Sequence, residues 1–108
     1  MPTNEDWNWV QLMLMQGLLG AISPNLRRIV LCHEHGQWVI EATLREHCPE
    51  DVEEIRDVAD ETSIFMEDLH GVLTPAAQKG IGCSFVIDAG FLPVVQDEIR
   101  RTVFLEKQ

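Results

Sequence analysis

Two short stretches combine histidine and cysteine in a way that could support metal or thiol chemistry. Residues 32–35 read Cys-His-Glu-His, and residues 47–48 read His-Cys, with Cys83 as a further possible ligand. A closed zinc site needs four convergent nitrogen or sulfur ligands, which usually arrive as paired short motifs. Successive side chains of a strand point to opposite faces, so only His33 and His35 would project together. We therefore interpret residues 32–35 as a hairpin tip with two solvated histidines.

A cysteine nucleophile would need a neighbouring base and surroundings that lower its pKa. Cys48 is the best candidate, because it follows a histidine at the start of an expected helix. Its neighbours Glu46, Glu50 and Asp51 are acidic, however, and would raise the pKa of the thiol. The chain contains no glycine-rich phosphate loop, nucleophile elbow or dinucleotide fingerprint. We expect no catalytic residue, no metal and no cofactor, with a small metal- or thiol-dependent enzyme as an alternative.

The third candidate is a concentration of carboxylates between residues 49 and 68. Nine of the 18 acidic residues of the chain lie there, against the single basic residue Arg56. At about 100° per residue the stretch forms an amphipathic helix. Its apolar side is expected to carry Val52, Ile55, Val58, Ala59, Met66 and Leu69. We predict that the opposite side binds a partner through Glu50, Glu53, Glu54, Asp57, Asp60, Glu61, Ile64, Phe65 and Asp68.

Ile64 and Phe65 are the apolar members of this predicted surface, within the acidic sector and on its border. Acids four residues apart, such as Glu50 and Glu54, repel each other at a cost of about 0.2–0.5 kcal/mol per pair. Several such pairs without interspersed lysine favour a cationic partner. A face that is only solvated is the alternative interpretation.

The net charge of −10 disfavours nucleic acid or anionic lipid as partners, because these polyanions attract clusters of lysine and arginine. Three cysteines without a CxxC spacing fit reduced thiols better than a disulfide framework. The acidic start of the chain lacks the basic region of a signal peptide. No apolar run is long enough to span a bilayer. We therefore expect a soluble, cytoplasmic protein.

The remaining elements can be assigned from periodicity and turn residues. Thr3 and Asp6 form a weak capping signal for a first helix, which runs to about Gly20. Leu12, Met13 and Leu19 widen its apolar stripe, so burial on more than one side is expected. A hairpin follows, then the acidic helix, a glycine-containing loop and two further strands. The hairpin strands are expected at 26–33 and 38–45, and the acidic helix at 49–68. The loop is expected at 71–82, and the last two strands at 83–88 and 99–106.

This order predicts one domain, residues 1–108, of the α+β class. The simplest architecture has two layers. It is a four-stranded, mainly antiparallel sheet with two helices on one face, in the order α-β-β-α-β-β.

Several of these stretches resemble the small immunity proteins that are encoded beside bacterial contact-dependent inhibition toxins and other polymorphic toxins. The resemblance rests on residues 9–12, 17–28, 36–41, 50–57 and 101–106. It implies a non-enzymatic cytoplasmic protein that binds and blocks one cognate toxin domain, often a basic nuclease. The contact residues of such proteins vary greatly, so none is transferred from the resemblance.

Charge and resemblance together predict an immunity protein that occludes the active site of a basic toxin domain. The oligomeric state is not predicted. Besides the small enzyme, an acidic adaptor or subunit without a toxin partner is the alternative.

Overall fold

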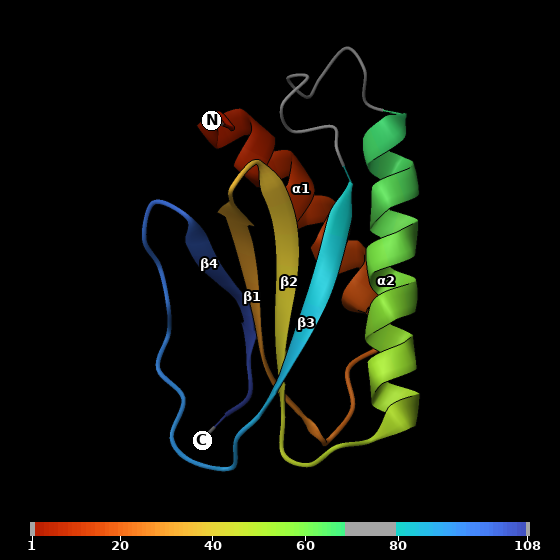
Figure 1. Ribbon diagram of the computed structural model, residues 1–108, viewed down its shortest axis with the longest axis vertical. Helices are drawn as coiled ribbons and strands as arrows, with labels where there is room; N and C mark the ends of the chain where they lie inside the picture. The colour runs from red at the N-terminus through yellow and green to blue at the C-terminus, as the bar shows by residue number, and fades with distance from the viewer. Residues whose placement is uncertain (1, 69–79, 108) are drawn as a thin grey trace.

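The computed structural model describes residues 2–68 and 80–107, which form two helices and a four-stranded sheet (Figure 1). The prediction of an α+β fold with these elements is confirmed. Leu69, which we expected on the apolar side of the acidic helix, and most of the predicted loop 71–82 lie outside the described residues. The elements in chain order are α1 (Asn4–Leu18), β1 (Leu26–Glu34), β2 (Gln37–Leu44), α2 (Pro49–Glu67), β3 (Ile81–Ile87) and β4 (Arg100–Leu105).

Helix α1 begins with the capping interaction that the sequence predicts. The Thr3 hydroxyl accepts a hydrogen bond from the Asp6 amide at 3.1 Å, and the Asp6 carboxylate accepts one from the Thr3 amide at 2.8 Å. These bonds satisfy donors that a helix start otherwise leaves free. The expected burial on more than one side is wrong for Leu12 and Leu19, whose side chains are exposed. One face of α1 is therefore buried, and apolar side chains also remain at the surface.

Strands β1 and β2 form the predicted antiparallel hairpin. His35 and Gly36 form its turn with φ values of 55° and 74°, and two positive φ values in succession match the twist of a tight hairpin. His33 is buried and packs edge-on against Trp38, with ring centroids 4.7 Å apart. Burial lowers the pKa of His33 below its ordinary value. The expectation of two solvated histidines is therefore wrong for His33 and holds for the exposed His35.

The sheet is mixed, and the prediction of a mainly antiparallel sheet is wrong in this respect. The strand order is β3-β2-β1-β4, and β3 runs parallel to β2 from the Trp38–Ile81 pair to the Leu44–Ile87 pair. The reason is the length of α2, about 28 Å for its residues, which matches the roughly 26 Å of β2. The helix returns the chain to the end of the sheet at which β2 began, so the next strand must run in the same direction.

Both helices share one core with the sheet (Figure 1). Gly17 allows α1 to approach α2, because a Cβ atom there would lie 3.1 Å from Cγ1 of Val58. Neither helix is long and apolar enough, in the part that is described, to cross a membrane. The largest fully buried side chains of the core include Val10, Leu14, Ile29, Leu31, Trp38, Ile40, Leu44, Ile55 and Met66.

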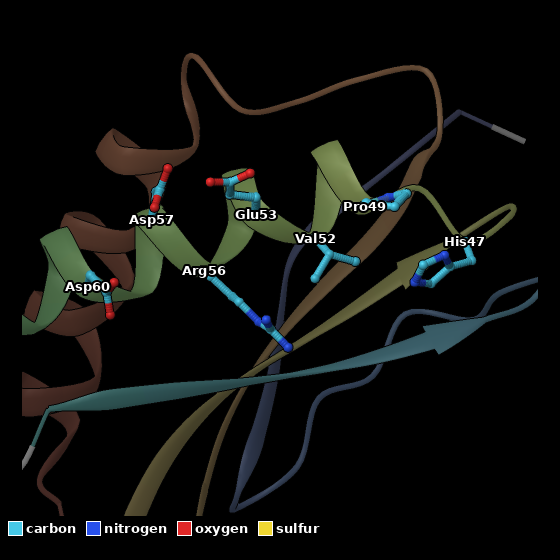
Figure 2. Close-up of a pocket in the computed structure, with 7 residues that line it drawn as sticks. All are labelled: His47, Pro49, Val52, Glu53, Arg56, Asp57 and Asp60. Atoms are coloured by element: carbon cyan, nitrogen blue, oxygen red, sulfur yellow. The ribbon is translucent and has the colours of Figure 1, made fainter.

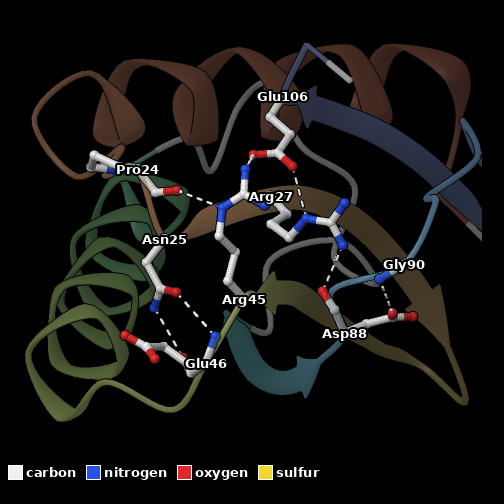
Figure 3. Close-up of polar contacts among 8 residues, drawn as sticks. All are labelled: Pro24, Asn25, Arg27, Arg45, Glu46, Asp88, Gly90 and Glu106. Atoms are coloured by element: carbon white, nitrogen blue, oxygen red, sulfur yellow. Dashed lines mark hydrogen bonds and ion pairs between the residues drawn. The ribbon is translucent and has the colours of Figure 1, made fainter.

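A polar network closes the end of the sheet where β1 begins (Figure 3). Arg27 sits at a β-bulge, is almost fully buried, and donates to Glu106 at 2.7 Å and to the Asp88 carbonyl at 2.6 Å. Arg45 pairs with the other Glu106 oxygen and donates to the Pro24 carbonyl at 3.2 Å. The network thus connects two positions to the central hairpin: Asp88, directly after β3, and Glu106, directly after β4.

Candidate functional site

Helix α2 carries the predicted partner-binding residues, and its ends are fixed by local chemistry. Pro49 occupies the first turn, where its missing amide hydrogen removes no helical bond. The Asn25 side chain donates to Asp51 at 2.9 Å, and this bond lowers the pKa of the Asp51 carboxyl. Near the other end, the Ser63 hydroxyl accepts a hydrogen bond of 3.0 Å from the Ile81 amide. Hydrogen bonds therefore attach α2 to the segment before β1 near its start and to β3 near its end.

All nine predicted partner-binding residues are exposed, as the helical period requires. The buried side of α2 consists of Ile55, Val58, Ala59, Thr62 and Met66. We call the exposed predicted carboxylates the acidic face. Its members are Glu50, Glu53, Glu54, Asp57, Asp60, Glu61 and Asp68.

No described residue forms an ion pair with the acidic face. Five of the six described arginines lie outside α2 and are engaged there, whereas the sixth, Arg56, lies on α2 itself. Arg27, Arg28, Arg45 and Arg100 pair with acids outside α2. Arg101 lies over the Trp7 ring at 5.0 Å. Among the described arginines, Arg56 alone lies beside the seven carboxylates of this face, so most of their negative potential is left uncompensated.

A hollow of about 220 Å³ lies between α1 and α2 beside the acidic face. Trp9, Met13 and Gln16 line it from α1, and Phe65 and Asp68 line it from α2. The hollow brings the predicted residue Phe65 next to an apolar surface that sequence reasoning missed. Leu12 and Met15 are exposed on α1 as well. The sequence did contain a signal of this apolar surface, because the apolar stripe of α1 is unusually wide. We interpreted that width as burial on more than one side.

A second, larger hollow of about 580 Å³ lies on the other side of the acidic face (Figure 2). Figure 2 shows Arg56 projecting from α2 toward β3, and its guanidinium lies 5.9 Å from the Phe85 ring centre. Glu53, Asp57 and Asp60 also line this hollow. Three carboxylates and one guanidinium therefore line this hollow, and we call Glu53, Asp57 and Asp60 its acidic rim. Figure 2 shows that Glu53 and Asp57 project from α2 on the opposite side from Arg56. His47, Pro49 and Val52 complete its lining.

The residues considered for metal or thiol chemistry are dispersed over β1, the start of α2 and β3. No group of three or more histidine, cysteine, aspartate or glutamate side chains within residues 2–68 and 80–107 is arranged to hold a metal ion. Burial, reinforced by Glu41, raises the pKa of Cys32 to about 11. Such a thiol is almost entirely protonated at neutral pH and is a poor nucleophile. Cys48 caps the start of α2, but its side chain makes no capping bond.

Comparison with known proteins identifies the family of the chain. No curated protein matches the sequence significantly. The family model of the MafI2 immunity protein, however, matches residues 7–76, well over half of the chain. This range contains most of α1 and all of β1, β2 and α2, whereas β3 and β4 follow it. The match confirms the resemblance to small immunity proteins of polymorphic toxin systems, and it implies a cognate toxin as partner. The chain belongs to the MafI2 immunity protein family.

Proposed function

We propose that this protein neutralises its cognate toxin by binding it through the acidic face of α2 and covering the toxin's active site. The observation that carries the proposal is the exposed acidic face, which has no ion pair with the described residues. Repulsion between its acids is relieved when a cationic surface binds.

The toxin that fits this surface best is a basic nuclease. A nuclease must bind a phosphate backbone, and it does so with lysine and arginine side chains around its active site. A row of carboxylates on a helix that is packed against the core can occupy the position of that backbone. Inhibition by occlusion requires no chemistry from the inhibitor, so we propose that the protein is not an enzyme. We also propose that it acts in the cytoplasm.

Specific interfaces also need an apolar centre, because a few well-packed anchors supply most of the binding energy. Ile64 lies within the acidic sector of α2 and is 60% exposed. Phe65 adjoins the hollow that Trp9 and Met13 line. We assign the anchoring role to these side chains, surrounded by the carboxylates as a polar rim.

The test is co-expression of this chain with the toxin domain encoded beside it. The triple variant Glu54→Lys, Asp57→Lys and Glu61→Lys should lose protection and should no longer co-purify with the toxin. The matched control places the same charge change elsewhere, with Glu5→Lys, Glu34→Lys and Glu98→Lys at exposed positions.

The control triple should still protect, because its acidic face is intact. Circular dichroism must show that both triples are folded. Full protection by a folded α2 triple would exclude the acidic face as the binding site. Equal loss in both triples would indicate a dependence on net charge alone.

A further inference from the structure

The two edges of the sheet differ in how they end. The outer edge of β4 is partly covered by the chain itself: the Thr102 amide donates to the Val95 carbonyl at 2.8 Å, and the Asp97 amide donates to the Arg100 carbonyl at 2.9 Å. Strand β3 forms the opposite edge, and no described strand pairs with its outer side. Within the described residues, the sheet therefore has one partly covered edge and one edge without a paired strand, which we call the open edge. Figure 1 shows α2 running alongside β3.

Hydrogen bonds at both ends of β3 show which main-chain groups face outward. The Ile81 amide donates to Ser63 of α2, away from β2. The Asp88 amide donates to the Leu44 carbonyl at 3.0 Å, toward β2. Because main-chain direction alternates along a strand, the even-numbered residues bond to β2 and the odd-numbered ones face outward. Cys83, Phe85 and Ile87 therefore present their N–H and C=O groups at the open edge.

Strand β3 also lacks the features by which natural edge strands avoid pairing. Its sequence, Ile-Gly-Cys-Ser-Phe-Val-Ile, contains no lysine, no other charged residue and no proline. The side chains of Val86 and Ile87 are exposed beside the edge. An open, uncharged strand of this kind is suited to accept another strand.

The surroundings of the edge determine the chemistry of the incoming strand. Arg56 contacts Phe85 from α2, and the hollow around Arg56 is lined by Glu53, Asp57 and Asp60. These three acids outnumber Arg56, so the lining of the hollow has a net negative charge that lysine or arginine side chains on an incoming strand would offset. A second copy of the chain would instead bring another net charge of −10 to the same place. Charge complementarity therefore favours a basic foreign strand over self-pairing.

We propose that an extended basic segment of the toxin domain pairs with the outer edge of β3 and continues the sheet. This inference rests on the proposed function and adds a second contact to it. The main-chain bonds of Cys83, Phe85 and Ile87 would supply binding, and the acidic rim would select cationic side chains. Because β3 lies outside residues 7–76, the family match does not cover this contact.

The test removes one outward donor without changing a side chain. The Gly82–Cys83 junction permits ligation of residues 1–82, as a thioester, to a synthetic peptide of residues 83–108 that carries N-methyl-Phe85. The matched control carries N-methyl-Ala89, an exposed loop position whose amide donates to no described residue. Both refolded full-length proteins are compared with the unmodified chain for binding to the toxin domain encoded beside it.

N-methyl-Phe85 should weaken binding by roughly 10- to 100-fold, as expected when an interfacial hydrogen bond is lost and its partner is left unpaired. N-methyl-Ala89 should bind like the unmodified protein. Equal binding by both N-methyl proteins would overturn the β3 contact and leave the proposed function intact. No binding by the unmodified protein would overturn both. If N-methyl-Phe85 abolished self-association in sedimentation equilibrium and left toxin binding unchanged, β3 would pair with a second copy, which would also overturn the proposal.

Discussion

The Nε atom of Arg27 lies 2.7 Å from Oε1 of Glu106, a residue 79 positions later in the chain. Arg27 is only 4% exposed, and it also donates to the Asp88 carbonyl. A buried guanidinium is costly unless charge and hydrogen bonds compensate it. This pair therefore attaches the end of β4 and the start of the 88–99 connection to the central hairpin (Figure 3).

Glu106→Gln should lower the melting temperature at neutral pH by several degrees, because Arg27 loses its compensating charge. The Arg27 hydrogen bond holds the pKa of Glu106 below its ordinary value of 4.5. Stability from this pair is present above that value and is lost as pH falls through the lower, folded-state pKa. Thermal melts should show the largest difference between wild type and variant above about pH 5, and a smaller one toward pH 3. A constant difference over this range would contradict the assignment.

Because α1 and α2 pack closely at Gly17, a larger side chain there should lower the stability of the protein more than one at an open position. Gly17→Leu should destabilise the protein by about 1–3 kcal/mol, because its side chain would be forced against Val58. Gly20 provides the control, since a Cβ atom there meets nothing within 4 Å. Urea denaturation of both variants measures the difference. Equal stability of Gly17→Leu and Gly20→Leu would contradict the close packing of the helices.

Cys32 should resist thiol reagents in the folded protein. Its pKa of about 11, raised by burial from 9.0, reduces the thiolate fraction at pH 8 about one-hundredfold. Alkylation at pH 8, followed by peptide mass spectrometry, should label Cys32 rapidly in urea and very slowly without it. Rapid labelling of the folded protein would reopen the thiol-chemistry alternative.

The hollow between the helices predicts that Phe65 anchors the toxin. Phe65→Ala should weaken toxin binding by about 30-fold or more, the loss that is typical of a central aromatic anchor. Phe91→Ala is the matched control, because Phe91 is 80% exposed on the connection between β3 and β4. Titration calorimetry with the toxin domain distinguishes the two variants. Equal affinities would exclude Phe65 as an anchor.

Local patterns in the sequence were sufficient to predict most of the fold. The capping residues Thr3 and Asp6, the turn at Gly36 and the proline at the start of α2 are short-range signals, and the structure has all of them. Strand direction is a long-range property, since it depends on where α2 returns the chain. Period-two alternation alone could not therefore reveal that β3 is parallel to β2.

The candidate site was predicted only in part, again because contacts between elements distant in the sequence are not visible in local patterns. The helical period placed the acids and Phe65 on the exposed side of α2. The neighbours of Phe65 come from α1, so Trp9 and Met13 could be recognised only after the helices were packed. The open edge of β3 likewise required the strand order. His33 was misjudged because its packing partner Trp38 lies across the hairpin.

The measurement that tests the central claim most directly is the association rate between this chain and its toxin domain at several salt concentrations. Electrostatic steering by the acidic face predicts a fast rate that falls steeply with salt. The variant with Glu54→Lys, Asp57→Lys and Glu61→Lys should associate about 10- to 1,000-fold more slowly at low salt. The control with Glu5→Lys, Glu34→Lys and Glu98→Lys should keep most of the wild-type rate. Equal rates and equal salt dependence for the folded α2 variant and the wild type would contradict the account.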